Sequence, residues 1–189
     1  SSASIQQFLT QNLDGLLGAD AVVSKKGALT SEQLNDISKL SQKIVTTQQV
    51  KTMLTYKGQW QQAQLKAVDE HYPLQGELIT SPTLATEGVI TPNGPEQGHI
   101  WLDARLVSGL AIEVGQTLVI ADNQFLFSRV LQHEPDRLME GHSVEMRAMI
   151  NALDMAVLAL PNDLIQFRYL LAAKSEQISQ LVEWQKDNL

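Results

Sequence analysis

The sequence predicts an α+β fold of two lobes, in which a β-rich lobe is inserted into an α/β lobe. Helical and strand patterns alternate in the first third, in the order helix, strand, helix, strand, strand. A final strand and helix have no partner in the middle third but would complete the first third. A proline-glycine turn ends the third strand. We therefore predict a discontinuous lobe of residues 1–75 and 162–189, with residues 76–160 inserted.

Each element of the first third has a local signal. Apolar residues at helical spacing predict helices, whereas alternation or short apolar runs predict strands. Thr30 or Ser31 caps the second helix, and Gln33 stands at the capping-box position relative to Thr30. Lys57-Gly58 is a hairpin signal. The expected elements are a helix over 5–17, a strand over 19–24, a helix over 31–40, and strands over 44–56 and 61–69.

The turn after residue 71 is the most informative local feature of the chain. Pro73 fixes its own φ, donates no ladder hydrogen bond and pushes Tyr72 towards extended geometry. The preceding strand must therefore stop or change sheet. Gly76 supplies a turn conformation that a residue with a Cβ adopts only under strain. We interpret Tyr72, Pro73 and Gly76 as a candidate hinge between the two lobes.

The middle third is less regular. Its Thr, Ser, Pro and Gly content predicts a long irregular connection over 76–95. Asn151 could start a short helix, and residues 155–160 could form a buried strand. The remaining expected elements are a short helix over 101–110, a hairpin of strands 114–120 and 125–131, a polar loop over 132–147, a strand over 164–172 and a helix over 176–186.

Composition excludes several classes of protein. The hydrophobic content of 43% is sufficient for a folded core. The net charge is −7 and no stripe of lysine or arginine occurs, which disfavours nucleic acid and anionic lipid head groups as partners. The chain has no cysteine, so thiol chemistry, disulfides and cysteine-bound zinc are excluded. No window approaches the roughly twenty apolar residues that cross a bilayer.

Catalytic and cofactor motifs are absent from the sequence. Neither the Walker pattern nor the dinucleotide fingerprint occurs, so no nucleotide cofactor is expected. Ser108-Gly109 falls late in a predicted helix, where a hydrolase nucleophile would not lie. The best metal candidates share one polar loop, but their spacing fits no ligand rule, and we interpret them as a solvated loop: His133, Glu134, Asp136, His142 and Glu145.

Two further groups have both a functional and an ordinary interpretation. Residues Asp69, Glu70 and His71 could act as acid and base, but carboxylates at such a junction more often accept backbone hydrogen bonds. Trp60, Trp101 and Trp184 could line a cleft, but single tryptophans on apolar faces more often belong to the core. We favour the ordinary interpretation for both groups and predict no catalytic or metal site.

Five short motifs, taken in order, resemble a known family. They are Ala67-Val68-Asp69, Tyr72-Pro73-Leu74-Gln75-Gly76, Trp101-Leu102-Asp103-Ala104-Arg105-Leu106, Val114-Gly115-Gln116-Thr117 and Glu134-Pro135-Asp136. Together they resemble the large extracytoplasmic segment of FtsX/MacB-type ABC transporter permeases, over roughly residues 60–172. The most similar subgroup is often encoded beside a lysophospholipase or thioesterase. Gln75 and Gln116 depart from the arginine and aspartate that are common at these positions in the family.

This resemblance implies a non-catalytic domain on the periplasmic side of the bacterial inner membrane, within a multi-pass membrane protein. It implies that the domain couples cytoplasmic ATP hydrolysis to the handling or export of lipophilic cargo. The implied partners are a separate ATP-binding subunit, a second permease copy and a periplasmic protein. The terminal helices would then continue into membrane spans. The alternative is a free-standing periplasmic binding or chaperone module for an amphiphile, and a hydrolase comes third.

Overall fold

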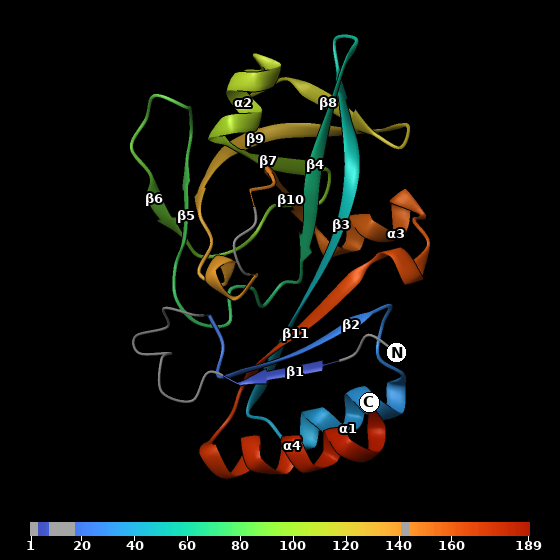
Figure 1. Cartoon of the computed structure of the whole chain (residues 1–189). Coiled ribbons are helices and arrows are strands. Elements are labelled where there is room, and N and C mark those ends of the chain that lie inside the picture. Colours follow the sequence, from blue (N-terminus) through green and yellow to red (C-terminus); the bar gives the residue numbers. More distant parts are fainter. Residues whose placement is uncertain (1–3, 8–17, 141–143) are drawn as a thin grey trace.

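The computed structural model describes residues 4–7, 18–140 and 144–189. They form one hydrogen-bonded network of strands with helices at its margins (Figure 1). The predicted α+β class is confirmed. Among the described residues, no helix has both the length and the apolar character needed to cross a bilayer.

Strands dominate the described part of the chain. The strands are β1 (Ser4–Gln7), β2 (Ala21–Lys26), β3 (Lys43–Tyr56), β4 (Gln59–Val68), β5 (Leu78–Ser81), β6 (Val89–Thr91), β7 (His99–Asp103), β8 (Thr117–Ile120), β9 (Asn123–His133), β10 (Arg147–Asn151) and β11 (Gln166–Ala172). The α-helices are α1 (Ser31–Lys39), α2 (Ala104–Leu110), α3 (Ala152–Leu158) and α4 (Ser175–Asn188), with 3₁₀ turns η2 (Arg137–Glu140) and η3 (Asn162–Leu164).

Six strands close into a small barrel. β3 pairs with β4, β4 with β10, β10 with β7, β7 with β9 and β9 with β8. β8 then returns to β3 through Thr55 and Val119. Because side chains alternate along each strand, every barrel strand points one row of its side chains into the barrel interior. The interior is apolar and fully buried, and includes Leu54, Leu65, Ile100, Phe127 and Ile150.

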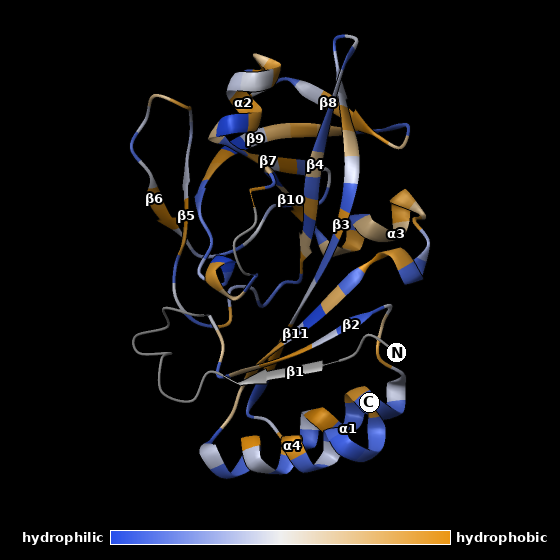
Figure 2. Ribbon diagram, viewed as in Figure 1, coloured by the Kyte–Doolittle hydropathy of each residue, from blue (hydrophilic) through white to orange (hydrophobic). Residues whose placement is uncertain are grey.

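β3 extends beyond the barrel into a second sheet. Its first half pairs with β11, which pairs with β2, which in turn pairs with β1. Helices α1 and α4 cover one face of this sheet through Ile37, Ile178 and Leu181. Figure 2 shows the hydrophobic side of α4 turned towards the sheet. The first and last described elements, β1 and α4, lie at the end of the molecule opposite α2 (Figure 1).

A third apolar cluster joins the outer face of the barrel to the second sheet. It includes Val45 and Leu170 from the sheet, Met149 from the barrel, Tyr72 from the turn after β4 and Leu78 from the start of β5. Tyr72 is 1% exposed. The turn singled out from the sequence is therefore packed between the barrel and the sheet.

The predicted first helix is wrong where it can be compared with the structure. Residues 4–7 form β1, which pairs with β2 through Ile5 and Val23. In this short segment, pairing with the edge of the second sheet outweighs the helical spacing of the apolar residues. Residues 8–17 of the predicted helix lie outside the described residues.

Four predictions in the middle third are also wrong. Helix 101–110 begins only at Ala104, because Trp101 belongs to β7 and Asp103 caps α2 by accepting the Leu106 N–H at 2.9 Å. The apolar run 155–160 falls in helix α3 and the turn after it, not in a strand. The connection 76–95 contains β5 and β6, and 114–120 contributes a strand only from Thr117.

Other elements agree with the sequence. Thr30, not Ser31, caps α1, and the full capping box with Gln33 is present. Lys57 and Gly58 form the β3–β4 turn with φ of 46° and 76°. β11 pairs with β2 and β3, the strands it was expected to complete. The boundaries of two lobes at 75 and 162 stay a prediction, since β3 runs through both the sheet and the barrel.

Candidate functional site

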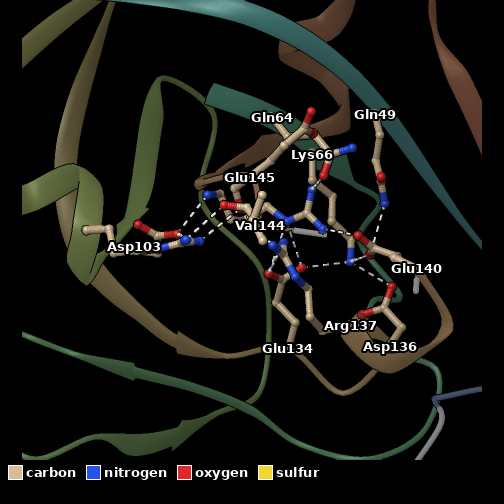
Figure 3. A network of polar contacts seen from close by, with 12 residues as sticks. Gln49, Gln64, Lys66, Asp103, Glu134, Asp136, Arg137, Glu140, Val144 and Glu145 are labelled. Atoms are coloured by element: carbon tan, nitrogen blue, oxygen red, sulfur yellow. Dashed lines mark hydrogen bonds and ion pairs between the residues drawn. The ribbon is translucent and has the colours of Figure 1, made fainter. Parts of the chain in front are cut away.

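Lys66 lies at the centre of a buried cluster of charges on the outer face of the barrel. Leu65 and Ala67 point into the barrel, so Lys66 between them points out. The segment after β9 covers it, and its side chain is 0% exposed. Its ammonium donates to Glu134 at 2.8 Å, Asp136 at 2.7 Å and Glu140 at 3.1 Å (Figure 3).

Arg147 contributes the second buried cation. It begins β10, and the parallel pairing sets it beside Gln64 of β4. Its Nε donates to both carboxylate oxygens of Glu134 at 3.1 and 3.0 Å, and its terminal nitrogens donate to Gln64 Oε1 at 2.7 Å and to Glu140. Arg137 adds a longer ion pair to Glu134 at 3.5 Å. Three carboxylates are thus matched by three cations.

The pKa values of Lys66, Glu134 and Glu140 are each shifted in the direction that favours the charged form. Burial alone would lower the pKa of Lys66, but the carboxylates of Asp136, Glu134 and Glu140 raise it above its ordinary value. Burial opposes ionisation of Glu140 as well, yet Lys66 and Arg147 lower the pKa of Glu140 to about 2. The same two cations lower the pKa of Glu134.

Tyr72 connects the candidate hinge to this cluster. Its hydroxyl donates to Asp136 at 2.5 Å, and the Lys66 ammonium lies 5.2 Å from the centre of its ring. Burial and the charge of Asp136 raise the pKa of Tyr72 well above its ordinary value. The Tyr72–Pro73 peptide is cis, and Gly76 has a φ of 78°. The glycine therefore occupies the left-handed region that the turn was expected to require.

The prediction of a solvated loop over 132–147 is wrong. Glu134 and Asp136 are 6% and 2% exposed, and they reach Lys66 because η2 folds over β4. Their oxygens and one of Glu140 lie within 4.8 Å of one another, and the Lys66 ammonium contacts all three carboxylates. The negative charge of these carboxylates, which a metal ion would otherwise neutralise, is balanced by the Lys66 ammonium.

The other described metal candidates, His133 and Glu145, do not join the carboxylates of this cluster. His133 is exposed, and Glu145 forms an ion pair with Lys51 at 2.8 Å. His142 lies outside the described residues. The five candidates therefore do not form one ligand set within the part of the chain that the structure describes.

The remaining candidates fall into structural positions. Asp69 accepts the Thr46 N–H at 2.8 Å and the His71 N–H at 3.0 Å, the backbone role we favoured, while Glu70 is exposed. Trp101 is buried and Trp184 is partly buried. The prediction of a core position is wrong for Trp60, which is 69% exposed beside the β3–β4 turn.

Sequence reasoning missed Lys66, Arg147 and Glu140. A signal was available for the first two, because each is a charged residue next to apolar residues of a barrel strand. Lys66 stands between Leu65 and Ala67, and Arg147 directly precedes the apolar run 148–150. A charge in such a run is rarely buried without a partner. Glu140 had no comparable signal, since its partners come from distant strands.

Solved structures of other proteins share this fold. No family model matches the chain. The periplasmic region of MacB from Actinobacillus actinomycetemcomitans superposes with a TM-score of 0.57 at 12% identity, over 94% of this chain and 87% of that one. The fold is that of the MacB periplasmic region. The extracellular domain of the YknZ transporter from Gram-positive bacteria shares this MacB-like fold, with a TM-score of 0.56 at 9% identity over 85% and 86% of the two chains.

A sequence relative agrees with the MacB-like fold. The ABC transporter permease YbbP of Escherichia coli (strain K12), itself described as uncharacterised, is 24% identical over 186 residues, which cover 97% of this chain. The chain spans 22% of the length of that permease. The predicted resemblance to the extracytoplasmic segment of such permeases is confirmed, and these relatives are transporter permeases or their domains rather than enzymes. Association with a lysophospholipase or thioesterase stays a prediction.

Proposed function

We propose that the chain is a non-catalytic extracytoplasmic domain of an ABC transporter permease, and that it couples cytoplasmic ATP hydrolysis to the movement of lipophilic cargo outside the membrane. In a bacterium with two membranes it would stand on the periplasmic side of the inner membrane, as part of a multi-pass protein. A separate subunit would bind ATP, and a second permease copy would complete the transporter.

The buried charge cluster at the candidate hinge carries the proposal. The end of β4, through Lys66, and the turn that follows it, through Tyr72, meet there the distant segment around η2, through Asp136. Tyr72 and Lys66 share the same carboxylate, so a displacement of the turn alters the environment of the ammonium directly. Tyr72, Pro73 and Gly76 would thereby set the pose of the barrel relative to the second sheet.

The positions of the first and last elements support the same function. β1 and α4 lie together at the end opposite α2 (Figure 1). Membrane spans joined to both ends of the chain would leave from this one end, and the barrel would stand away from the bilayer. A movement of those spans would reach the second sheet first and the barrel through β3 and the cluster.

The arrangement of charges supports a non-catalytic role. Catalytic acids and bases need a group that can exchange a proton with a substrate. The carboxylates of Glu134 and Glu140 are instead held charged by Lys66 and Arg147, and all four side chains are at most 5% exposed.

Replacing Gly76 by valine in the intact permease tests the coupling. A β-branched residue resists a φ of 78°, so the turn must change its path. With the transporter and its ATPase subunit in proteoliposomes, we expect fewer molecules of a fluorescent single-chain lipid to move per ATP hydrolysed, while the ATPase rate persists.

Gly58→Val provides the matched control. Gly58 has nearly the same φ, 76°, but lies at the β3–β4 turn with no atom within 4 Å of an added Cβ. It should cost similar stability and leave the lipid-to-ATP ratio unchanged. If both variants, or neither, lower that ratio, the Tyr72 turn is only a connector and the proposed coupling is wrong.

A further inference from the structure

A groove of about 580 Å³ opens between α2, β9 and the loop from β5 to β6. Its floor consists of Val107, Phe127 and Val130, which are at most 6% exposed. Leu84 and Val114 form walls and remain 45% and 36% exposed. The volume falls within the range of roughly 300–1,000 Å³ that small-molecule sites occupy. The groove therefore has room for a small ligand against a mostly apolar surface.

One charge borders this apolar space. Of the described residues that line the groove, Glu113 alone is ionisable. The backbone N–H of Glu113 donates to Gln116 Oε1 at 2.8 Å, and the same oxygen accepts a hydrogen bond from the Tyr56 hydroxyl at 2.6 Å. These two bonds hold the backbone of Glu113 in place. Within the described ranges, no lysine, arginine or histidine forms an ion pair with Glu113. Its negative charge is therefore available at the mouth of the groove.

We propose that this groove binds the single alkyl chain of an amphiphile whose head group contains a cationic centre. The alkyl chain would lie between the exposed side chains of Leu84 and Val114, and the cationic centre would face Glu113. The net charge of −7 on the whole chain disfavours an anionic amphiphile at the same place. The inference rests on the proposed function, since it names the class of the lipophilic cargo.

Calorimetric titration of the 189-residue chain with alkyltrimethylammonium ions tests the site. Octyl, decyl and dodecyl homologues are used below their micelle concentrations, with alkyl sulfates of the same lengths for comparison. Each methylene that enters an apolar site is worth about 0.8 kcal/mol, so Kd should fall about fourfold per methylene until the groove is full. The sulfates should bind roughly fivefold more weakly, as expected for one exposed charge.

Two neighbouring substitutions locate the binding. Ser108→Trp places a large side chain in the groove and should abolish binding. Gly109→Trp adds the same side chain one residue later on α2, where no atom lies within 4 Å of an added Cβ, and should leave Kd unchanged. Glu113→Gln should keep the dependence on chain length and remove the preference for the ammonium ions.

Three results would overturn the proposal. They are a Kd that does not depend on chain length, a Ser108→Trp variant that is folded and binds like the original chain, and alkyl sulfates that bind as tightly as the ammonium ions. Binding of apolar peptides with none of the amphiphiles would show that the groove serves a protein partner. Failure here leaves the lipid-to-ATP ratio of the Gly76→Val experiment untouched, so the two proposals fail separately.

Discussion

Lys66 is met by carboxylates that follow it by 68 to 74 positions in the chain. Its position in β4 makes a shifted register of this strand unfavourable. A slip of one residue would turn Lys66 into the apolar barrel and Leu65 out towards the carboxylates. The observed register places Leu65 inside the barrel and Lys66 against the three carboxylates. The cluster therefore stabilises this pairing of β4 with β3 and β10.

Replacing Lys66 by methionine should lower the free energy of unfolding by about 3–5 kcal/mol. The substitution keeps most of the side-chain volume but leaves buried carboxylates without their shared cation. Urea denaturation of the variant and the original chain measures the difference.

Lys51→Met is the matched control for this substitution. Lys51 pairs with Glu145 at 2.8 Å, but its side chain is 63% exposed. Its loss should cost under about 1 kcal/mol. Equal effects of the two substitutions would mean that the buried cluster contributes no more than a surface ion pair.

Individual turn and cap residues could be predicted from the sequence because their signals are local. Gly76 has the positive φ, and Thr30 with Gln33 forms the capping box. The partners of Lys66 could not be predicted in this way. Nothing within a few residues of Glu140 shows that η2 will carry it onto β4, because that contact depends on the closed barrel.

At the scale of elements, α1 depends on the N-cap residue that precedes it. Thr30 Oγ1 accepts the Gln33 N–H at 3.1 Å, and Gln33 Oε1 accepts the Thr30 N–H at 3.0 Å. These bonds satisfy backbone donors that the helix itself leaves free. They also fix where α1 begins, and so which of its residues face the second sheet.

Thr30→Ala should lower the free energy of unfolding by about 1 kcal/mol, the usual cost of removing such a cap. Ser31→Ala, one residue later and also exposed, should be neutral or slightly stabilising because alanine has a high helix propensity. Chemical denaturation distinguishes the two. The opposite order of effects would show that Ser31 is the effective cap.

Elements were predicted correctly where a long pattern and an end signal coincide, as in β3, β4 and α4. Short segments were predicted less well. Residues 155–160 are apolar throughout, and periodicity cannot separate a buried helix from a buried strand in such a run. The Asn151 side chain, which accepts the Leu153 N–H at 2.9 Å, decides for a helix.

For the whole molecule, the cluster predicts how stability depends on pH. Glu134 and Glu140 have pKa values below the ordinary 4.5, with Glu140 at about 2, so their contribution is present above pH 4.5 and is lost as the pH falls towards 2. Lys66 and Tyr72 have raised pKa values, so their contributions are complete below about pH 10 and decline above it. We expect a plateau of stability between roughly pH 5 and 10.

Unfolding free energies measured by urea at a series of pH values test this plateau. Glu140→Gln should give a shallower decline on the acid side, since one of the groups that takes up a proton is gone. A free energy that stays constant from pH 5 to pH 2.5 would contradict the assigned role of the carboxylates.

The closure of the barrel could not be predicted from the sequence. It requires β10 to lie parallel to β4 and β7 to lie parallel to β9, although the strands of each pair are separated by other elements. Local periodicity contains no information on such pairings. The short β8, which completes the ring through Thr55 and Val119, was visible only as one arm of a hairpin.

β3 has 14 residues, which at about 3.3 Å per residue makes a continuous rod of about 46 Å. Its first half belongs to the second sheet and its second half to the barrel, without interruption. Pulling the two parts apart along this rod would load many backbone hydrogen bonds at once in shear, which is the stiff direction. Thr47 to Gln49 pair with β11 on one side and with β4 on the other, so the hydrogen bonds of the two parts overlap at their junction. A twist applied to the second sheet is therefore passed to the barrel through this shared strand.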